Sequence, residues 1–169
     1  RDHWKLDLPH APYLAMVAVG IWDKVSDTWR GRPVDYYVDP GYGKDARQIF
    51  AHTPEMITFF SEKLGYDFVW PKYAQVIVKD FVSGAMENTT AVVFGDFVQF
   101  HEEDMLEEGS NDYIVSHELF HHWFGDLVTS ESWSNLTVNE SFANYSEYLW
   151  DEYKYGKDVA DAHNFSDMQ

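Results

Sequence analysis

The chain has 169 residues, of which 45% are apolar and 18% aromatic, so it is long and apolar enough to fold around one core of ordinary size. Its formal charge of −17 would repel phosphate backbones and anionic membrane surfaces, which argues against nucleic acid as a partner. It contains no cysteine, which excludes disulfides and thiolate ligands and leaves nitrogen and oxygen atoms as the ligands of any metal site.

The first forty residues predict the end of a β-rich region. The apolar run at residues 11–22 is too short to span a bilayer and lacks the basic flank of a signal peptide, so we interpret it as a strand. A second strand is expected at residues 34–38. Proline and glycine punctuate residues 39–43, and this predicted linker divides the chain into a region 1–40 and a region 41–169.

Residues 45–64 carry apolar side chains at a helical period that Gly65 stops, and Pro54 is expected to kink or divide this helix. Two strands are predicted at residues 73–82 and 91–100, on either side of a glycine-containing loop. An acidic connection is expected to follow at residues 101–109.

A buried helix should come next, with Ser110 as its N-cap. Its apolar residues surround it almost completely: Ile114, Val115, Leu119, Phe120, Trp123 and Phe124. A polar strip of His117, Glu118 and His121 inside such a helix costs free energy unless its members are coordinated or hydrogen-bonded. Burial therefore favours a ligand role for this strip.

The strip also has the spacing of a metal site. His117 and His121 are four residues apart and project from one face of a helix, and Glu118 lies one step round. Glu140 follows His121 after 18 intervening residues. A random shuffle of this composition would produce H-E-x-x-H with a probability of roughly three in a hundred, and a Glu at one fixed offset lowers that to roughly two in a thousand.

Neutral imidazoles of His117 and His121 and the carboxylate of Glu140 would give one Zn²⁺ ion three ligands and leave the fourth position to water, as in catalytic zinc sites. Zinc can lower the pKa of such a water from about 15.7 to about 7. Glu118 is then the expected general base, which takes the proton and passes it to the leaving amine.

Neighbouring residues have other expected roles. His122 lies off the metal-binding face and is expected to be a packing or hydrogen-bonding neighbour. For Glu140 the alternative is a capping box with Thr137, and both interpretations put Glu140 in the first turn of a helix that continues through residue 149. Asp126 and Glu131 are the nearby candidates for orienting the imidazoles.

A second motif lies upstream, Gly84-Ala85-Met86-Glu87-Asn88. G-A-M-E-N followed by H-E-x-x-H-x18-E resembles the M1 aminopeptidases, the gluzincin group that includes aminopeptidase N and leukotriene A4 hydrolase. Both motifs stand in the family's order, and the resemblance extends from about Tyr13 to about Tyr155. Many relatives carry W-L-N-E-G-F-A at the third ligand, and this chain departs from them at residues 137, 138 and 141.

The resemblance implies an α+β, thermolysin-like zinc metallopeptidase catalytic domain, incomplete in this chain and preceded by the end of a β-rich domain. It implies that the free α-amine of a peptide binds Glu87 and that the backbone around Gly84 and Ala85 lies along the bound peptide, with Met86 and Asn88 completing this substrate-binding motif. The expected reaction is hydrolysis of the N-terminal peptide bond. The expected partners are peptides with a free N-terminus and the remaining domains of a longer enzyme.

Two parts of the family's machinery are expected outside this chain. The resemblance places the transition-state tyrosine beyond Gln169, so the tyrosines at 145, 148, 153 and 155 are not given its role. A further amine-binding acid belongs to the preceding β domain. We therefore expect the isolated chain to hold zinc but to turn substrate over poorly.

The motifs are compatible with two other kinds of function. The same ligand spacing would serve an endopeptidase or an epoxide hydrolase of the leukotriene A4 hydrolase sort. A peptide-binding module on an inactive peptidase fold is the non-enzymatic alternative, and the intact set of His117, Glu118, His121 and Glu140 argues against it.

Overall fold

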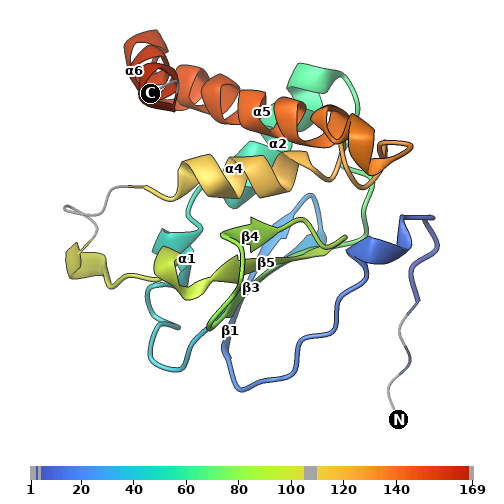
Figure 1. The fold of residues 1–169 in the computed structure, drawn as a ribbon. Helices are drawn as coiled ribbons and strands as arrows, with labels where there is room; N and C mark the ends of the chain where they lie inside the picture. Colours follow the sequence, from blue (N-terminus) through green and yellow to red (C-terminus); the bar gives the residue numbers. More distant parts are fainter. Residues whose placement is uncertain (1–2, 4, 105–109, 168–169) are drawn as a thin grey trace.

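The computed structural model describes residues 3, 5–104 and 110–167, which form a mixed β-sheet covered on one side by helices (Figure 1). The strands are β1 (Asp23–Trp29), β2 (Arg32–Val38), β3 (Tyr73–Val78), β4 (Ala85–Met86) and β5 (Ala91–Gly95). Their order across the sheet is β1-β2-β3-β5-β4. The three central strands β2, β3 and β5 are parallel, and β1 and β4 pair antiparallel at the two edges.

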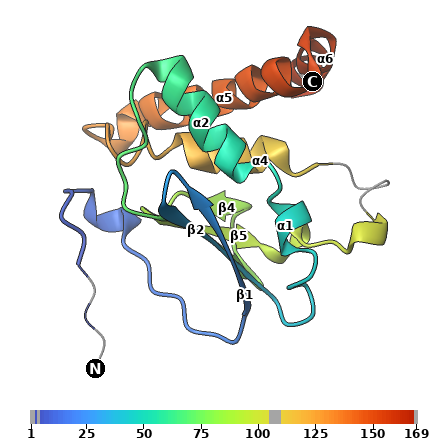
Figure 2. The same ribbon diagram turned by 180° about the vertical axis from the view of Figure 1, so that it is seen from behind.

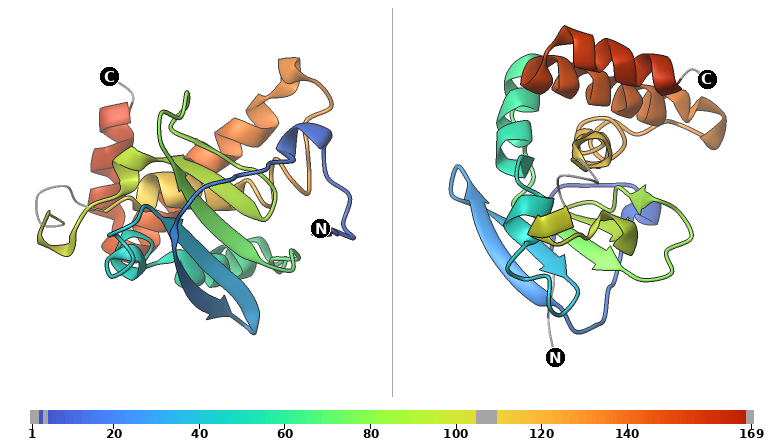
Figure 3. Two further views of the ribbon diagram at one scale, coloured as in Figure 1. Left: turned by 90° about the horizontal axis from the view of Figure 1, so that it is seen from below. Right: turned by 90° about the vertical axis from the view of Figure 1, so that its left-hand side faces the viewer.

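The helices form two layers above the sheet. They are α1 (Ala46–Ile49), α2 (Thr53–Leu64), α4 (Asp112–Phe120), α5 (Thr137–Tyr155) and α6 (Lys157–Asp167). Helix α4 lies between the sheet and α5, and α2 runs beside it (Figures 2 and 3). The described chain is therefore α+β, as predicted, and α4 is its central helix.

Burial explains the element types. Five of the six residues of β3 are buried, as expected for a strand in the middle of the sheet, between the parallel strands β2 and β5. In β1 half-buried and exposed positions alternate up to the buried Trp29, which is typical of an edge strand with one solvated face. Large aromatic side chains fill the core between sheet and helices, among them Tyr36, Phe50, Phe60, Phe94 and Trp150.

Helices α4 and α5 are antiparallel and approach closely. Ser116, Ala143 and Ser146 are fully buried small residues in their interface, and the Ser146 hydroxyl donates to the Ser116 carbonyl at 3.3 Å. At the start of α4, the Asp112 carboxylate accepts from the Trp150 indole of α5 at 2.8 Å. The C-terminal end of α4 consequently faces the first turn of α5.

The strand predicted at residues 11–22 is wrong. Only a short 3-10 turn forms there, at Pro12–Leu14, and the following segment joins no ladder before β1 begins at Asp23. Val17, Val19 and Ile21 are 89%, 92% and 86% exposed. A β-branched pattern permits a strand, but a strand also requires a pairing partner, and none of the described residues supplies one.

The strand expected at residues 34–38 is confirmed as part of β2, and the sheet crosses the expected linker. Arg30 and Gly31 both have positive φ and join β1 to β2 as a tight hairpin. Strand β2 then pairs with β3, with Val34 opposite Tyr73, so main-chain hydrogen bonds cross the boundary placed between residues 40 and 41.

The predictions for residues 45–65 are confirmed. The helical stretch is divided into α1 and α2, with Pro54 in the first turn of α2, where the missing N–H is tolerated. Gly65 ends α2 with a left-handed φ of 63°.

The two strands around the second motif are shorter than predicted. Strand β3 ends at Val78 and β5 at Gly95, and the chain after Gly95 turns into a 3-10 helix at Asp96–Val98. Ala85 and Met86, expected in a loop, form the edge strand β4 against β5. The acidic connection begins with a 3-10 turn at Glu102–Asp104, and residues 105–109 lie outside the described residues.

Candidate metal centre

Helix α4 carries the two histidines to the side that faces α5. His117 is in its last turn, and His121 directly follows its last residue with helical φ and ψ. The chain then turns sharply at Gly125, whose φ is +138°. A Cβ at Gly125 would lie 3.1 Å from the His121 ring, so glycine is required for the backbone to pass this close.

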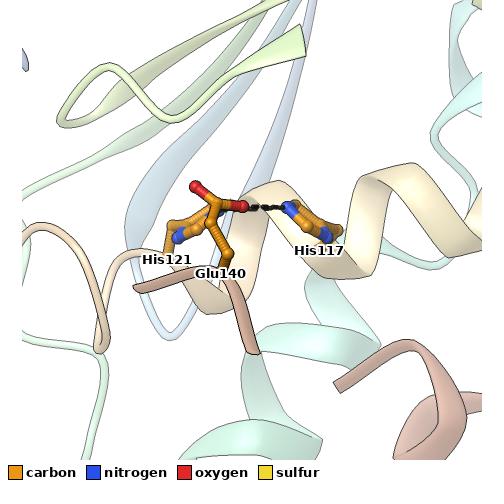
Figure 4. A group of neighbouring side chains, drawn as sticks. All are labelled: His117, His121 and Glu140. Carbon is orange, nitrogen blue, oxygen red and sulfur yellow. Dashed lines mark hydrogen bonds and ion pairs between the residues drawn. The ribbon is translucent and has the colours of Figure 1, made fainter. Parts of the chain in front are cut away.

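The histidines converge on Glu140 in the first turn of α5 (Figure 4). The Nε2 atoms of His117 and His121 are 3.1 Å apart, and the Glu140 Oε2 atom lies 3.4 Å from the first and 3.6 Å from the second. Zinc bonds of about 2.0–2.1 Å at tetrahedral angles separate ligand atoms by about 3.3–3.4 Å. The triangle of these three atoms has the size that a zinc ion requires.

Glu140 does not form the alternative capping box. Helix α5 begins after Leu136 with no side-chain hydrogen bond at its N-cap, and the Glu140 carboxylate points at the imidazoles instead. The fully buried Asn139 anchors this turn, because its amide accepts from the Ser130 N–H at 3.1 Å and donates to the Tyr13 hydroxyl at 3.3 Å.

The hydrogen bonds of the two Nδ1 atoms define the tautomers. His117 Nδ1 lies 2.8 Å from a carboxylate oxygen of Glu147, and His121 Nδ1 lies 2.9 Å from the carbonyl oxygen of Phe124. Both partners are acceptors, so each Nδ1 carries the hydrogen and each Nε2 presents a lone pair. Three lone-pair atoms therefore face one point, an arrangement that a cation stabilises.

The electrostatics of the cluster also favour positive charge. Burial lowers the pKa of His117, but hydrogen bonds with Glu140 and Glu147 outweigh it and raise the pKa to about 10. The same hydrogen bond with His117, together with one to His121, lowers the pKa of Glu140 below its usual range. A proton or a metal ion could supply the charge that this site attracts.

Glu118 lies beside the triangle and makes no hydrogen bond through its buried Oε2 atom. Burial raises its pKa to about 7, against the opposing effect of His121 and His117. Single ligand-type atoms of Glu118, Glu87 and His121 lie within 4.8 Å of one another. His121 belongs to this group of possible ligands and to the triangle with His117 and Glu140, so the two groups adjoin each other.

The second motif reaches the same place. Glu87 follows β4 and is only 7% exposed, beside Glu118 and His121. The Asn88 amide donates to the Leu14 carbonyl at 3.3 Å and so ties the motif to the N-terminal segment. Gly84 accepts a main-chain hydrogen bond from Gly95 at 3.0 Å, and an added Cβ would meet only ordinary contacts there.

His122 is a packing and hydrogen-bonding neighbour, as predicted. Its Nε2 atom accepts from the Thr90 N–H at 3.1 Å, and its ring packs against Tyr73 with centroids 4.9 Å apart. Burial lowers the pKa of His122 to about 3, so it is neutral. Ser110 makes the capping hydrogen bond expected of it, because its hydroxyl accepts from the Asp112 N–H at 3.1 Å. Asn111, one residue later, directly precedes the helix and makes no side-chain capping bond.

Glu147 is the residue that the sequence analysis missed. Glu131 is exposed, and the Asp126 carboxylate lies 3.5 Å from His122 rather than beside either converging imidazole. Glu147 follows Glu140 by seven residues, which is two helical turns, so both project from one face of α5. That seven-residue spacing is the feature of the sequence that could have identified Glu147 as a neighbour of the site.

Comparison with known proteins identifies relatives. Residues 49–168 match the model of the Peptidase family M1 domain. The chain is 31% identical to glutamyl aminopeptidase of Bos taurus over 153 residues, which cover 88% of this chain and 16% of the relative. It is 38% identical to aminopeptidase N of Streptomyces lividans over 143 residues, which cover 80% of this chain and 17% of the relative. It is 35% identical to aminopeptidase M1 of Arabidopsis thaliana over 144 residues, which cover 81% of this chain and 16% of the relative.

The chain thus spans about one sixth of the length of these curated relatives. None of the helices in the described ranges is both long enough and apolar enough to cross a membrane.

Proposed function

Because this chain belongs to peptidase family M1, we propose that it is the metal-binding part of a thermolysin-like zinc aminopeptidase, which removes residues from the free N-termini of peptides. The convergence of two imidazole Nε2 atoms and one carboxylate oxygen, 3.1–3.6 Å apart, is the observation that carries the proposal. Since the relatives are about six times longer, we expect further domains of the same protein to complete the enzyme.

His117, His121 and Glu140 would hold the zinc ion, which supplies Lewis-acid activation of a water and of the peptide carbonyl when bound. The Glu147 carboxylate and the Phe124 carbonyl keep both imidazoles in the tautomer that a metal needs. The three proposed ligands, the Glu147 carboxylate and the Phe124 carbonyl all come from α4, the turn after it, and α5. The packing of these two helices therefore decides the geometry of the site.

Glu118 is the proposed general base. A water attacking the carbonyl carbon gives its proton to the Glu118 carboxylate, the carbon–nitrogen bond breaks, and the same proton passes to the leaving amine. Burial raises the pKa of Glu118, which makes it a stronger base than an exposed carboxylate and still able to return the proton to the leaving amine.

Glu87 is the proposed anchor of the substrate's α-ammonium group, with Gly84, Ala85, Met86 and Asn88 beside the bound peptide. A carboxylate and an ammonium about 4 Å apart, at an effective dielectric constant of about 20, interact by about 4 kcal/mol before desolvation. Glu87 is nearly buried and close to Glu118, so it would select chain ends near the reacting bond.

The test compares substrates with free and blocked amines, using the full-length protein with its zinc content measured. We expect chromogenic aminoacyl amides to be hydrolysed at least about 100-fold faster than their N-acetylated forms, as an ion pair of this strength implies. A chelator should abolish the activity and added zinc restore it. Equal rates on both substrates would indicate an endopeptidase, and zinc binding without any hydrolysis would indicate a peptide-binding module.

A further inference from the structure

Three helix ends meet at one carboxylate oxygen, at the end of the α4–α5 interface away from the proposed zinc site. The oxygen is Oδ2 of Asp112, the first residue of α4. It accepts hydrogen bonds from His52 Nδ1 at 2.8 Å, from the Trp150 indole at 2.8 Å and from the Tyr155 hydroxyl at 2.6 Å. His52 is the N-cap of α2, and Tyr155 is the last residue of α5. One oxygen therefore joins the starts of α2 and α4 to the end of α5.

This carboxylate is both buried and charged. Asp112 is 8% exposed, and the Trp150 side chain that donates to it is fully buried. Burial raises the pKa of Asp112, but hydrogen bonds with His52, Tyr155 and Trp150 outweigh this effect and lower the pKa below its usual range. A buried charge is costly without its donors, so a shift of α5 that broke these bonds would be strongly unfavourable.

The Asp112 contact belongs to a series along the interface of α4 and α5, which run side by side (Figure 1). Polar contacts follow one another along the two helices: His121 with Glu140, His117 with Glu147, and Asp112 with Trp150 and Tyr155. Glu147 and Trp150 are three residues apart and project to the same side of α5. The Asp112 contact is thus the next one along the interface after the bond that orients His117.

Both helices are continuous between these contacts. Helix α5 extends from Thr137 to Tyr155 without a break, and α4 extends from Asp112 to Phe120, with His121 still in helical conformation. A displacement at one end of either helix is therefore transmitted to the other end. A slip of one residue along a helix axis is about 1.5 Å, whereas metal–ligand bonds tolerate deviations of about 0.2 Å. The zinc triangle consequently needs the two helices in one exact axial register.

The remaining buried contacts between α4 and α5 specify the register less strictly. Ser116, Ala143 and Ser146 are small side chains, which let the helices approach closely but interlock little. Hydrogen bonds to a buried charge are directional, and the selection of a register is the best-attested use of buried polar groups between helices.

We propose that Asp112 sets the axial register of α5 on α4 and is thereby a positioning residue for Glu140 and Glu147. The contacts of Asp112 with Trp150 and Tyr155 then act on the metal centre through the two helices, without touching the metal or the substrate. The consequence for zinc binding rests on the proposed function.

The test measures metal coordination in the full-length protein, with Co²⁺ in place of zinc. The visible spectrum of bound Co²⁺ reports the number and geometry of its ligands, and it requires no hydrolysis. We expect Asp112→Ala to change this spectrum at saturating cobalt and to weaken zinc binding about tenfold, the lower end of the effect of residues that orient metal ligands. Tyr155→Phe removes only one of the donors, from a partly exposed side chain, and should weaken zinc binding about threefold.

Tyr148→Phe is the matched control. Tyr148 is also on α5, and its hydroxyl donates to a carboxylate at 2.9 Å, but that carboxylate belongs to Asp161 of α6 rather than to α4. We expect its cobalt spectrum and zinc affinity to equal those of the wild type, and a change as large as that in Tyr155→Phe would count against the inference.

The outcomes separate this inference from the proposed function. Wild-type spectra and zinc affinities in the folded Asp112→Ala and Tyr155→Phe proteins would overturn it, even with a lowered Tm, because Asp112 would then only stabilise the fold. If Asp112→Ala does not fold, Tyr155→Phe alone decides. A wild-type protein that binds neither metal would instead refute the zinc site itself.

Discussion

The bond between Glu147 and His117 makes a quantitative prediction about zinc affinity. The Glu147 carboxylate lies 2.8 Å from His117 Nδ1, and its side chain is 22% exposed, so this charge-assisted hydrogen bond is largely shielded from water. Such a carboxylate holds the imidazole in orientation and makes its other nitrogen more basic. Removing one typically costs 10–100-fold in metal affinity, which is about 1.4–2.8 kcal/mol.

Two variants separate charge from orientation. Glu147→Gln keeps an acceptor oxygen but loses the negative charge, so we expect zinc affinity to fall about tenfold; Glu147→Ala loses both, and we expect a fall of about 100-fold. Glu152→Gln is the control, because Glu152 is on the same helix, is exposed, and changes the net charge equally.

Affinity would be measured by competition with a chelator of known zinc affinity at fixed pH, and unfolding of the metal-free forms would exclude a general loss of structure. Affinities of both Glu147 variants within twofold of the wild type would refute the reasoning. It would mean that α5 contributes to the site through Glu140 alone.

Three further predictions concern the residues around the zinc site. Glu118→Gln should retain stoichiometric zinc yet lose about 10²–10⁴-fold in kcat, as expected for removal of a general base, and near-normal turnover of the metal-loaded variant would contradict that role. Glu87→Gln should raise KM for free-amine substrates, and an unchanged preference for them over N-acetylated ones would count against amine binding. Burial raises the pKa of Asp126 from 3.8 to about 9, so the folded chain keeps a proton that the unfolded chain loses in that range, and stability falls as pH rises between those values. Asp126→Asn should remove this dependence of the unfolding free energy on pH, whose slope is up to about 1.4 kcal/mol per pH unit. Parallel curves of unfolding free energy against pH for the variant and the wild type would rule out a raised pKa of Asp126.

Local patterns in the sequence were sufficient for much of the candidate site. The four-residue spacing of His117 and His121 and the position of Glu140 in a first helical turn follow from the helical repeat, which depends on neighbouring residues alone. Pro54 and Gly65 likewise act through their own backbone geometry, and the structure has them at the start and the end of α2.

Pairing and packing between distant segments were decided only in the tertiary structure. The apolar run at residues 11–22 says that this segment could form a strand, but not that the described chain offers it no partner. The more polar residues 23–29 gain a partner through a two-residue turn. The role of Glu147 depends on the face of α5 that meets α4, which small buried residues select at their contact. The sequence by itself determined which side chains could bind a metal, and the packing of α5 on α4 brought their atoms together, because convergence in space depends on contacts between segments far apart along the chain.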